Sequence, residues 1–273
     1  MKLSPIDVYR DILPKTNCRD CGELTCLAFA VKVVSENFPL SKCPHISKDS
    51  IEKYEKILKE QHSKGIFAKK DPAKEALIWA KQRAASTDLM DLPQRIGGVI
   101  VDYNGQRALK LPYFNSYVYI TENGIFSELG ELEHYEQVFL YNHIAQGGKK
   151  DPTGKFVPFH ELPNTVSKIK SLEKHIKRPL ENTFKRKIQE LKTRALNIGA
   201  LDLSSDYPTA DLALLFKPLP KVPVLLLFWD EEKGEEDMPA QVNVLFDETI
   251  IDHLDIESIL FLLEKLVNLL TSE

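Results

Sequence analysis

The first 85 residues contain four stretches in which hydrophobic residues recur at helical spacing. Ser4-Pro5-Ile6-Asp7 supplies a cap, a proline and an acid, so we expect a helix from here to about Leu13. A second helix is predicted over about 26–37 by one apolar face, which is made by Leu27, Ala30, Val31 and Val34. Two more helices are expected over about 47–65 and 71–85. This part of the chain is therefore predicted to be helical.

After Gly97 the pattern changes to the short apolar runs of strands. The first two runs, 98–103 and 107–111, flank Asn104-Gly105, a pair typical of a type I′ hairpin. A third strand is expected over 113–121, ending at a second pair, Asn123-Gly124. Further strands are predicted over 211–217, 222–229 and 241–246. The middle one is continuously apolar, which indicates a central strand buried on both faces.

Helices separate and follow these strands. They are predicted over about 131–145, 181–197 and 255–270, with a long Gly- and Pro-containing loop over 146–163. Trp79 and Trp229 are expected to be buried packing anchors. The predicted fold class is α+β: a small helical module, then a larger domain with a mostly antiparallel or mixed sheet covered by helices.

Length and charge narrow the picture. A chain of 273 residues suits one large domain or two modest ones, and we expect a module over 1–70, a helical linker over 71–96 and an α+β domain over 97–273. The net charge of −4 gives no basis for nucleic-acid binding. We expect no membrane span, because the apolar runs are too short, and a cytoplasmic location, because the start lacks an apolar signal core.

All four cysteines lie near the start, at Cys18, Cys21, Cys26 and Cys43. A disulfide framework would not be confined to one end of a chain of this length, so the spacing C-x2-C-x4-C-x16-C-P predicts a metal site. A tight run of three cysteines with one distant Cys-Pro suits a 4Fe–4S cubane, which takes one thiolate at each iron. Structural zinc usually takes two separated pairs of ligands, and this alternative stays open, as does a site without metal.

Residues around the cysteines favour the cubane. Gly22 allows a tight turn close to a cluster sulfur. Thr25 is a candidate cap for the second helix, which would place Cys26 in the first turn. Unpaired N–H groups and the positive end of the helix dipole would then face an anionic cluster.

The segment from Asn17 to Ala30, Asn-Cys-Arg-Asp-Cys-Gly-Glu-Leu-Thr-Cys-Leu-Ala-Phe-Ala, with Cys43-Pro44 after it, resembles the small iron–sulfur module of anaerobic redox proteins. Its bearers include the corrinoid iron–sulfur protein large subunit and the B subunit of the Rnf electron-transport complex. The resemblance covers about residues 3–46 and implies one 4Fe–4S cluster that passes single electrons, with the four cysteines as ligands. The rest of the chain does not look like a corrinoid-binding barrel; it resembles a domain-of-unknown-function family found beside this module in anaerobes.

Three hypotheses about the function follow from these observations. The first hypothesis is an accessory single-electron carrier of anaerobic metabolism, whose large domain docks a redox partner protein or a small-molecule cofactor. The second is a cofactor-handling enzyme, for example a corrinoid-related one, with its pocket around the loop at 141–163, where His143 and His160 are candidate catalytic groups beside Tyr141. For each histidine, a hydrogen bond to the backbone is the favoured explanation over a catalytic role. A redox or iron sensor, with Cys18 or Cys43 exposed, is a third hypothesis.

Overall fold

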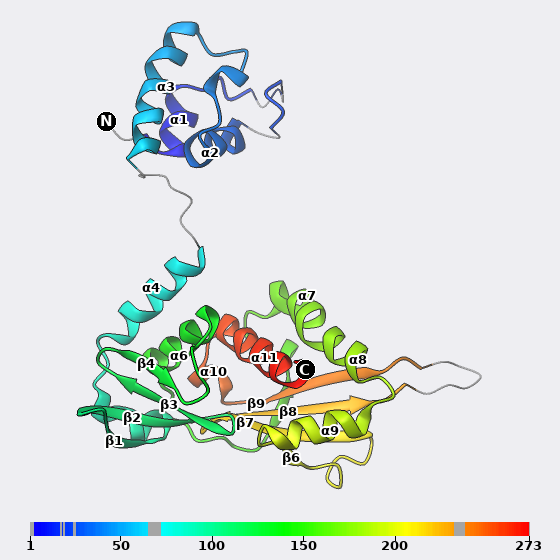
Figure 1. Cartoon of the computed structure of the whole chain (residues 1–273). Coiled ribbons are helices and arrows are strands. Elements are labelled where there is room, and N and C mark those ends of the chain that lie inside the picture. The colour runs from blue at the N-terminus through cyan, green and yellow to red at the C-terminus, as the bar shows by residue number, and fades with distance from the viewer. Residues whose placement is uncertain are drawn as a thin grey trace. The chain divides into compact units, whose positions relative to one another are not determined.

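The structure is a computed structural model of the whole chain, and it describes residues 3–16, 18, 20–23, 26–64, 72–231 and 238–272 (Figure 1). The chain forms two compact units, Met1–Pro72 and Ala73–Glu273, which are described separately. The predicted division into 1–70, 71–96 and 97–273 stays a proposal. No helix among the described residues is long and apolar enough to cross a bilayer.

The small unit is helical. Its elements are α1 (Pro5–Asp11), α2 (Cys26–Glu36), the 3₁₀ turn η1 (Leu40–Lys42) and α3 (Lys48–Ser63). A capping box between Ser4 and Asp7 begins α1, and the Ser47 hydroxyl caps α3. The buried Gln61 side chain accepts a hydrogen bond from the Leu3 N–H (2.7 Å) and donates one to the Leu3 carbonyl (3.2 Å), which holds the start of the chain against α3.

The apolar face of α2 supplies more of the core of the small unit than any other helix does. Phe29, Ala30, Val33 and Val34 are buried there, while Leu27 and Val31 are exposed. The core cluster also includes two of the cysteines, and its full membership is Leu3, Val8, Leu13, Cys26, Phe29, Ala30, Val33, Val34, Leu40, Cys43, Ile46 and Leu58.

The large unit contains two antiparallel sheets, which agrees with the predicted α+β class. One has four strands in the order β1-β2-β3-β4: Val99–Tyr103, Gln106–Tyr113, Ser116–Thr121 and Gly124–Ser127. The other has the order β5-β9-β8-β7-β6: Phe156–Pro158, Gln241–Asp247, Val222–Trp229, Leu212–Leu219 and Leu201–Asp202. The Phe114 N–H donates to the Pro218 carbonyl (2.9 Å) and ties the first sheet to the second.

The helices of the large unit precede, separate and follow its strands. They are α4 (Pro72–Ala84), α5 (Leu92–Ile96), α6 (His134–Gln146), α7 (Ile169–Leu172), α8 (Arg178–Phe184), α9 (Ile188–Asn197), α10 (Ile250–His253) and α11 (Ile256–Thr271). Helix α11 runs across the five-stranded sheet between α6 and α8 (Figure 1). Its buried leucines share one core cluster with Leu226 of β8, whereas Leu225 and Leu227 face a separate cluster.

Strand β8 lies in the middle of its sheet, as the apolar run predicted. Val222 through Leu227 and Phe228 are buried on both faces, and only Trp229 is partly exposed. Each fully buried apolar side chain of this kind contributes about 1.5–3 kcal/mol to stability relative to an exposed one. The strand is therefore a principal source of the stability of the large unit.

The Asn104-Gly105 hairpin is confirmed. Tyr103 pairs with Gln106, and both turn residues have positive φ (54° and 78°), as a type I′ turn requires. The strand expected over 113–121 is wrong at its start, because Phe114 adopts φ 51° and reverses the chain between β2 and β3. Strand β4, which follows the second Asn-Gly pair, was not predicted.

Two other predicted segments need correction. The helix expected over 181–197 is broken between α8 and α9, because Arg186 has φ 60°, its N–H donates to Asp230 (2.5 Å) and its guanidinium pairs with Glu231 (2.6 Å). These partners lie far along the chain, so the local pattern could not predict the break. The loop expected over 146–163 contains β5, which pairs with β9.

The two tryptophans differ from the expectation that both are packing anchors. Trp79 on α4 has 66% of its surface exposed, so its prediction is wrong. Trp229 is partly buried, and its indole N–H donates to the Thr209 carbonyl (2.6 Å).

Candidate metal centre

The four cysteines lie in the small unit, on segments that flank α2. Cys18 and Cys21 precede α2, Cys26 is its first residue, and Cys43 directly follows η1. None of the four forms a disulfide. Asn17, Arg19, Leu24 and Thr25 lie outside the described residues, and so does the cap predicted at Thr25.

The thiols differ in burial. Cys26 and Cys43 are buried (6% and 4% exposed), Cys21 is intermediate and Cys18 is exposed. Burial raises the pKa of the Cys43 thiol, and electrostatic interactions with Cys21, Cys26 and Cys18 raise it further. The side chains of all four cysteines are therefore close enough to interact electrostatically.

The backbone around Cys43 and Gly22 suits an anionic group. A backbone hydrogen bond from His45 to Cys43 opposes the rise in the pKa of that thiol. Such N–H to sulfur contacts tune the potential of iron–sulfur clusters. Gly22 has φ +85°, and a Cβ built on it would meet no atom within 4 Å, so glycine is needed there for its backbone conformation.

The chemistry of this donor set fits an iron–sulfur cluster. Four thiols outside any disulfide, two of them shielded from solvent, could supply the thiolate ligands that a cubane needs. Cys26 is the first residue of α2, where the positive end of the helix dipole lies. Cys18, Cys21, Cys26 and Cys43 are thus the residues that could hold the cluster.

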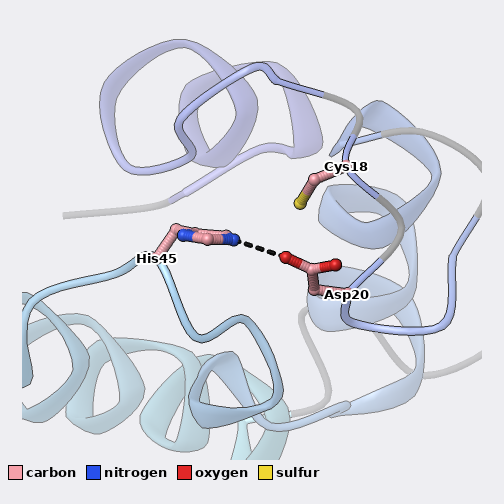
Figure 2. A group of neighbouring side chains, drawn as sticks. All are labelled: Cys18, Asp20 and His45. Carbon is pink, nitrogen blue, oxygen red and sulfur yellow. Dashed lines mark hydrogen bonds and ion pairs between the residues drawn. The ribbon is translucent and has the colours of Figure 1, made fainter.

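Asp20 and His45, which the sequence analysis did not single out, lie beside Cys18 (Figure 2). His45 Nε2 donates a hydrogen bond to Asp20 Oδ2 (2.7 Å), which links the first cysteine segment to the residues after Cys43. This bond, together with one from Cys18, lowers the pKa of Asp20. Their positions, one between two cysteines and the other two residues after Cys43, were the available signal in the sequence.

In the large unit, His143 lies on α6 and is fully buried. Its Nδ1 donates to the His253 carbonyl (3.0 Å), while no hydrogen-bond partner lies near its Nε2 in the described structure. Burial lowers the pKa of His143 to about 4, so the ring is neutral at pH 7. It has the environment of a packed core histidine.

His160 and Tyr141, which were predicted to share a pocket with His143, lie in other places. His160 is exposed on the short turn after β5 and lines a cavity with Trp229 and Lys177. Tyr141 lines a different cavity, of about 830 Å³, with Lys81 and Met90. The three side chains predicted to form one pocket therefore lie in three separate surroundings.

Gly147 and Gly148 are required by close packing. A Cβ on Gly147 would lie 2.4 Å from the guanidinium of Arg95, whose Nε donates to the Gly147 carbonyl (3.1 Å). A Cβ on Gly148 would lie 2.7 Å from the ring of His253. The two glycines let the chain pass close to Arg95 and His253.

Comparison with known proteins assigns families to both parts of the chain. Residues 13–45 match the family described as "Putative Fe-S cluster", which supports an iron–sulfur cofactor in the small unit. Residues 88–269 match the family described as "Domain of unknown function (DUF3786)". No solved structure matches the chain.

The curated relatives are longer proteins, and each is named as a subunit. The acetyl-CoA decarbonylase/synthase complex subunit gamma of Methanothermobacter thermautotrophicus is 45% identical over 58 residues, which cover 21% of this chain and 12% of the relative. That of Methanocaldococcus jannaschii is 24% identical over 257 residues, covering 88% and 46%. The corrinoid/iron-sulfur protein large subunit of Moorella thermoacetica is 45% identical over 47 residues, covering 17% and 10%.

The chain therefore spans less than half of the length of these relatives. The resemblance to the corrinoid iron–sulfur protein, expected from the cysteine segment, is confirmed. The second family match covers about two thirds of the sequence, from α5 and its preceding turn to α11. By that match, the chain belongs to the DUF3786 family and carries an iron–sulfur module before its family domain.

Proposed function

We propose that this protein is a single-electron carrier of anaerobic metabolism that holds one 4Fe–4S cluster through Cys18, Cys21, Cys26 and Cys43. The observation that carries the proposal is the placement of all four cysteines in one small unit, with Cys26 and Cys43 in its core. The family match over residues 13–45 supports the same cofactor class. When bound, the cluster would supply one-electron oxidation and reduction.

The cysteines and His45 would contribute to cluster binding in different ways. The buried Cys26 and Cys43 keep water away from one side, and the His45 N–H favours the anionic form of the Cys43 sulfur. The exposed Cys18 leaves the other side open to solvent. Electrons would therefore enter and leave at the Cys18 side.

A protein partner is part of the proposal. The gamma subunits to which the chain is similar are named as parts of an acetyl-CoA decarbonylase/synthase complex. We propose that the large unit docks the redox partner or a small cofactor, while the small unit exchanges the electron. A corrinoid-handling enzyme is not favoured, because His143, His160 and Tyr141 have separate surroundings.

A redox or iron sensor is the second candidate, and one observation favours it. Cys18 is exposed, as a ligand that senses solvent species would need to be. The carrier and the sensor differ in reversibility, because a carrier keeps its cluster over many redox cycles.

The test is a reductive titration of the full chain, purified without oxygen and followed by absorption. We expect bleaching of the cluster band by one electron equivalent per chain and full recovery on reoxidation over repeated cycles. Loss of iron after one cycle would favour the sensor. Failure of the full chain to take up iron and sulfide when zinc is withheld would overturn both readings.

A further inference from the structure

Three different metal-ligand atoms converge on the exposed side of the small unit. The Cys18 sulfur, an Asp20 carboxylate oxygen and a His45 ring nitrogen all lie within 4.8 Å of one another, and all three residues are exposed (Figure 2). Thiolate, carboxylate and imidazole are the ligand types that zinc uses in proteins. No other group of this kind occurs among the cysteine, histidine and acidic residues that the structure describes.

The geometry is close to that of one tetrahedral ion. Zinc bonds of about 2.0–2.3 Å separate neighbouring ligand atoms by roughly 3.3–3.8 Å. On zinc binding, the distance of 2.7 Å between His45 and Asp20 would lengthen slightly. The three ligand atoms, which now lie within 4.8 Å of one another, would move to bonding distance from the ion. Because the group faces solvent, water could take the fourth position.

The charges of the group also suit a divalent cation. Asp20 is exposed, and an exposed carboxylate is charged at neutral pH. Ion binding would release the Cys18 thiol proton to solvent, since only the thiolate is a ligand. One thiolate and one carboxylate then balance the two charges of the ion, and His45 binds as neutral imidazole.

We propose that the cluster-free small unit binds zinc through Cys18, Asp20 and His45, and that zinc and the iron–sulfur cluster compete for Cys18. The competition, but not the zinc site, rests on the proposed function. Cys18 cannot serve both metals at once, so occupancy by zinc blocks the assembly of the cluster. Relative supply of zinc and iron would then set which form of the protein accumulates.

The experiment uses the full chain after anoxic removal of the cluster. Zinc is titrated by calorimetry, and cobalt(II) replaces it to report a thiolate-to-metal charge-transfer band. Asp20→Asn and His45→Gln are expected to weaken zinc binding by at least about tenfold each. Both side chains are exposed, so the fold should tolerate these variants, and circular dichroism checks this.

The same two variants should still assemble the cluster. Their side chains are not among its proposed ligands, and the hydrogen bond from His45 to Cys43 comes from the backbone. Cys18→Ser should lose both the cobalt charge-transfer band and the cluster. Preloading the wild type with zinc should slow cluster reconstitution, whereas preloading His45→Gln should not.

Unchanged zinc affinity in both Asp20→Asn and His45→Gln would overturn the zinc site. Unimpeded cluster assembly in the zinc-loaded wild type would overturn the competition. The proposed function fails separately, if the anoxic protein never carries iron and sulfide. In that case the zinc titration still reports on the three ligands.

Discussion

Two histidines, one in each unit, lie in opposite environments. In the small unit, His45 is exposed, donates to the Asp20 carboxylate and lies beside the Cys18 sulfur. In the large unit, His143 is fully buried and donates to a backbone carbonyl. Solvent species can therefore reach the first imidazole and cannot reach the second. The one group of neighbouring metal-ligand side chains found among the described residues lies in the small unit.

The two cores differ in the same way. Two of the four cysteines belong to the small core, so a metal bound to them would also hold the fold together. The core of the large unit is built from side chains of β8, α11 and their neighbours. Apolar packing alone would stabilise it.

The largest expected effect comes from removing one proposed ligand. Cys43→Ser should abolish cluster binding and loosen the small unit, because it removes a buried ligand from a small core. Iron analysis and hydrogen exchange measure both effects. Lys42→Ala changes the exposed neighbouring residue and is the control. Iron retained in full by Cys43→Ser would show that this cysteine is not a ligand.

A core truncation in the large unit should leave the metal untouched. Leu226→Ala in β8 is expected to lower the free energy of unfolding by about 2–5 kcal/mol, because the side chain is fully buried. Tryptophan fluorescence reports this unit, since Trp79 and Trp229 both belong to it. Leu201→Ala, at a half-exposed position, should change stability by less than about 0.5 kcal/mol. If Leu226→Ala lost as much iron as Cys43→Ser does, the prediction that the metal site is independent of the large unit would be wrong.

The buried His143 should make the stability of the large unit depend on pH. Its pKa is about 4 in the folded state, below the ordinary value of 6.5. The unfolded state therefore takes up the proton first as the pH falls below 6.5, and unfolding becomes easier by up to about 3 kcal/mol on reaching pH 4. Denaturant unfolding followed by tryptophan fluorescence at several pH values measures this change.

His143→Asn is the matched variant for this effect, because its amide can still donate to the His253 carbonyl. Its free energy of unfolding should fall less steeply between pH 6.5 and pH 4 than that of the wild type. Parallel profiles for the two proteins would mean that His143 does not carry the proton linkage.

The smallest effect is expected at Gly22. Gly22→Ala should destabilise the small unit by about 1 kcal/mol, because φ +85° is unfavourable for alanine although the space around it is open. Gly22→Asn should cost less, since asparagine tolerates this region better. Hydrogen exchange of α2 in the cluster-bound protein compares the two. Equal protection in all three proteins would remove the conformational role of this glycine.

Local signals predicted much of the fold. The cap at Ser4, the Asn104-Gly105 turn and the apolar run of β8 each act within a few residues, and all three occur in the structure. The break at Arg186 depends on Asp230 and Glu231, more than forty residues away. Trp79 looked like a core residue because of its size, yet α4 buries Ala80 and leaves the indole in solvent.

The candidate site likewise has a part that local sequence signals predicted and a part that depends on residues far apart in the chain. Cysteine spacing alone identified four thiols that lie in one unit and interact electrostatically. Asp20 and His45 were missed because they are common surface residues, and only the fold brings them together across 25 positions. In the other direction, His143 and His160 are close in sequence, but the fold buries one and exposes the other.

The central claim is that the four thiols hold one iron–sulfur cluster, and metal and sulfide analysis of the anoxically purified full chain tests it most directly. The account predicts iron and acid-labile sulfide in equal amounts, a paramagnetic signal from the reduced state, and loss of all three in Cys43→Ser. A protein that takes up no iron and sulfide when zinc is withheld, or iron that survives replacement of Cys43, would contradict it.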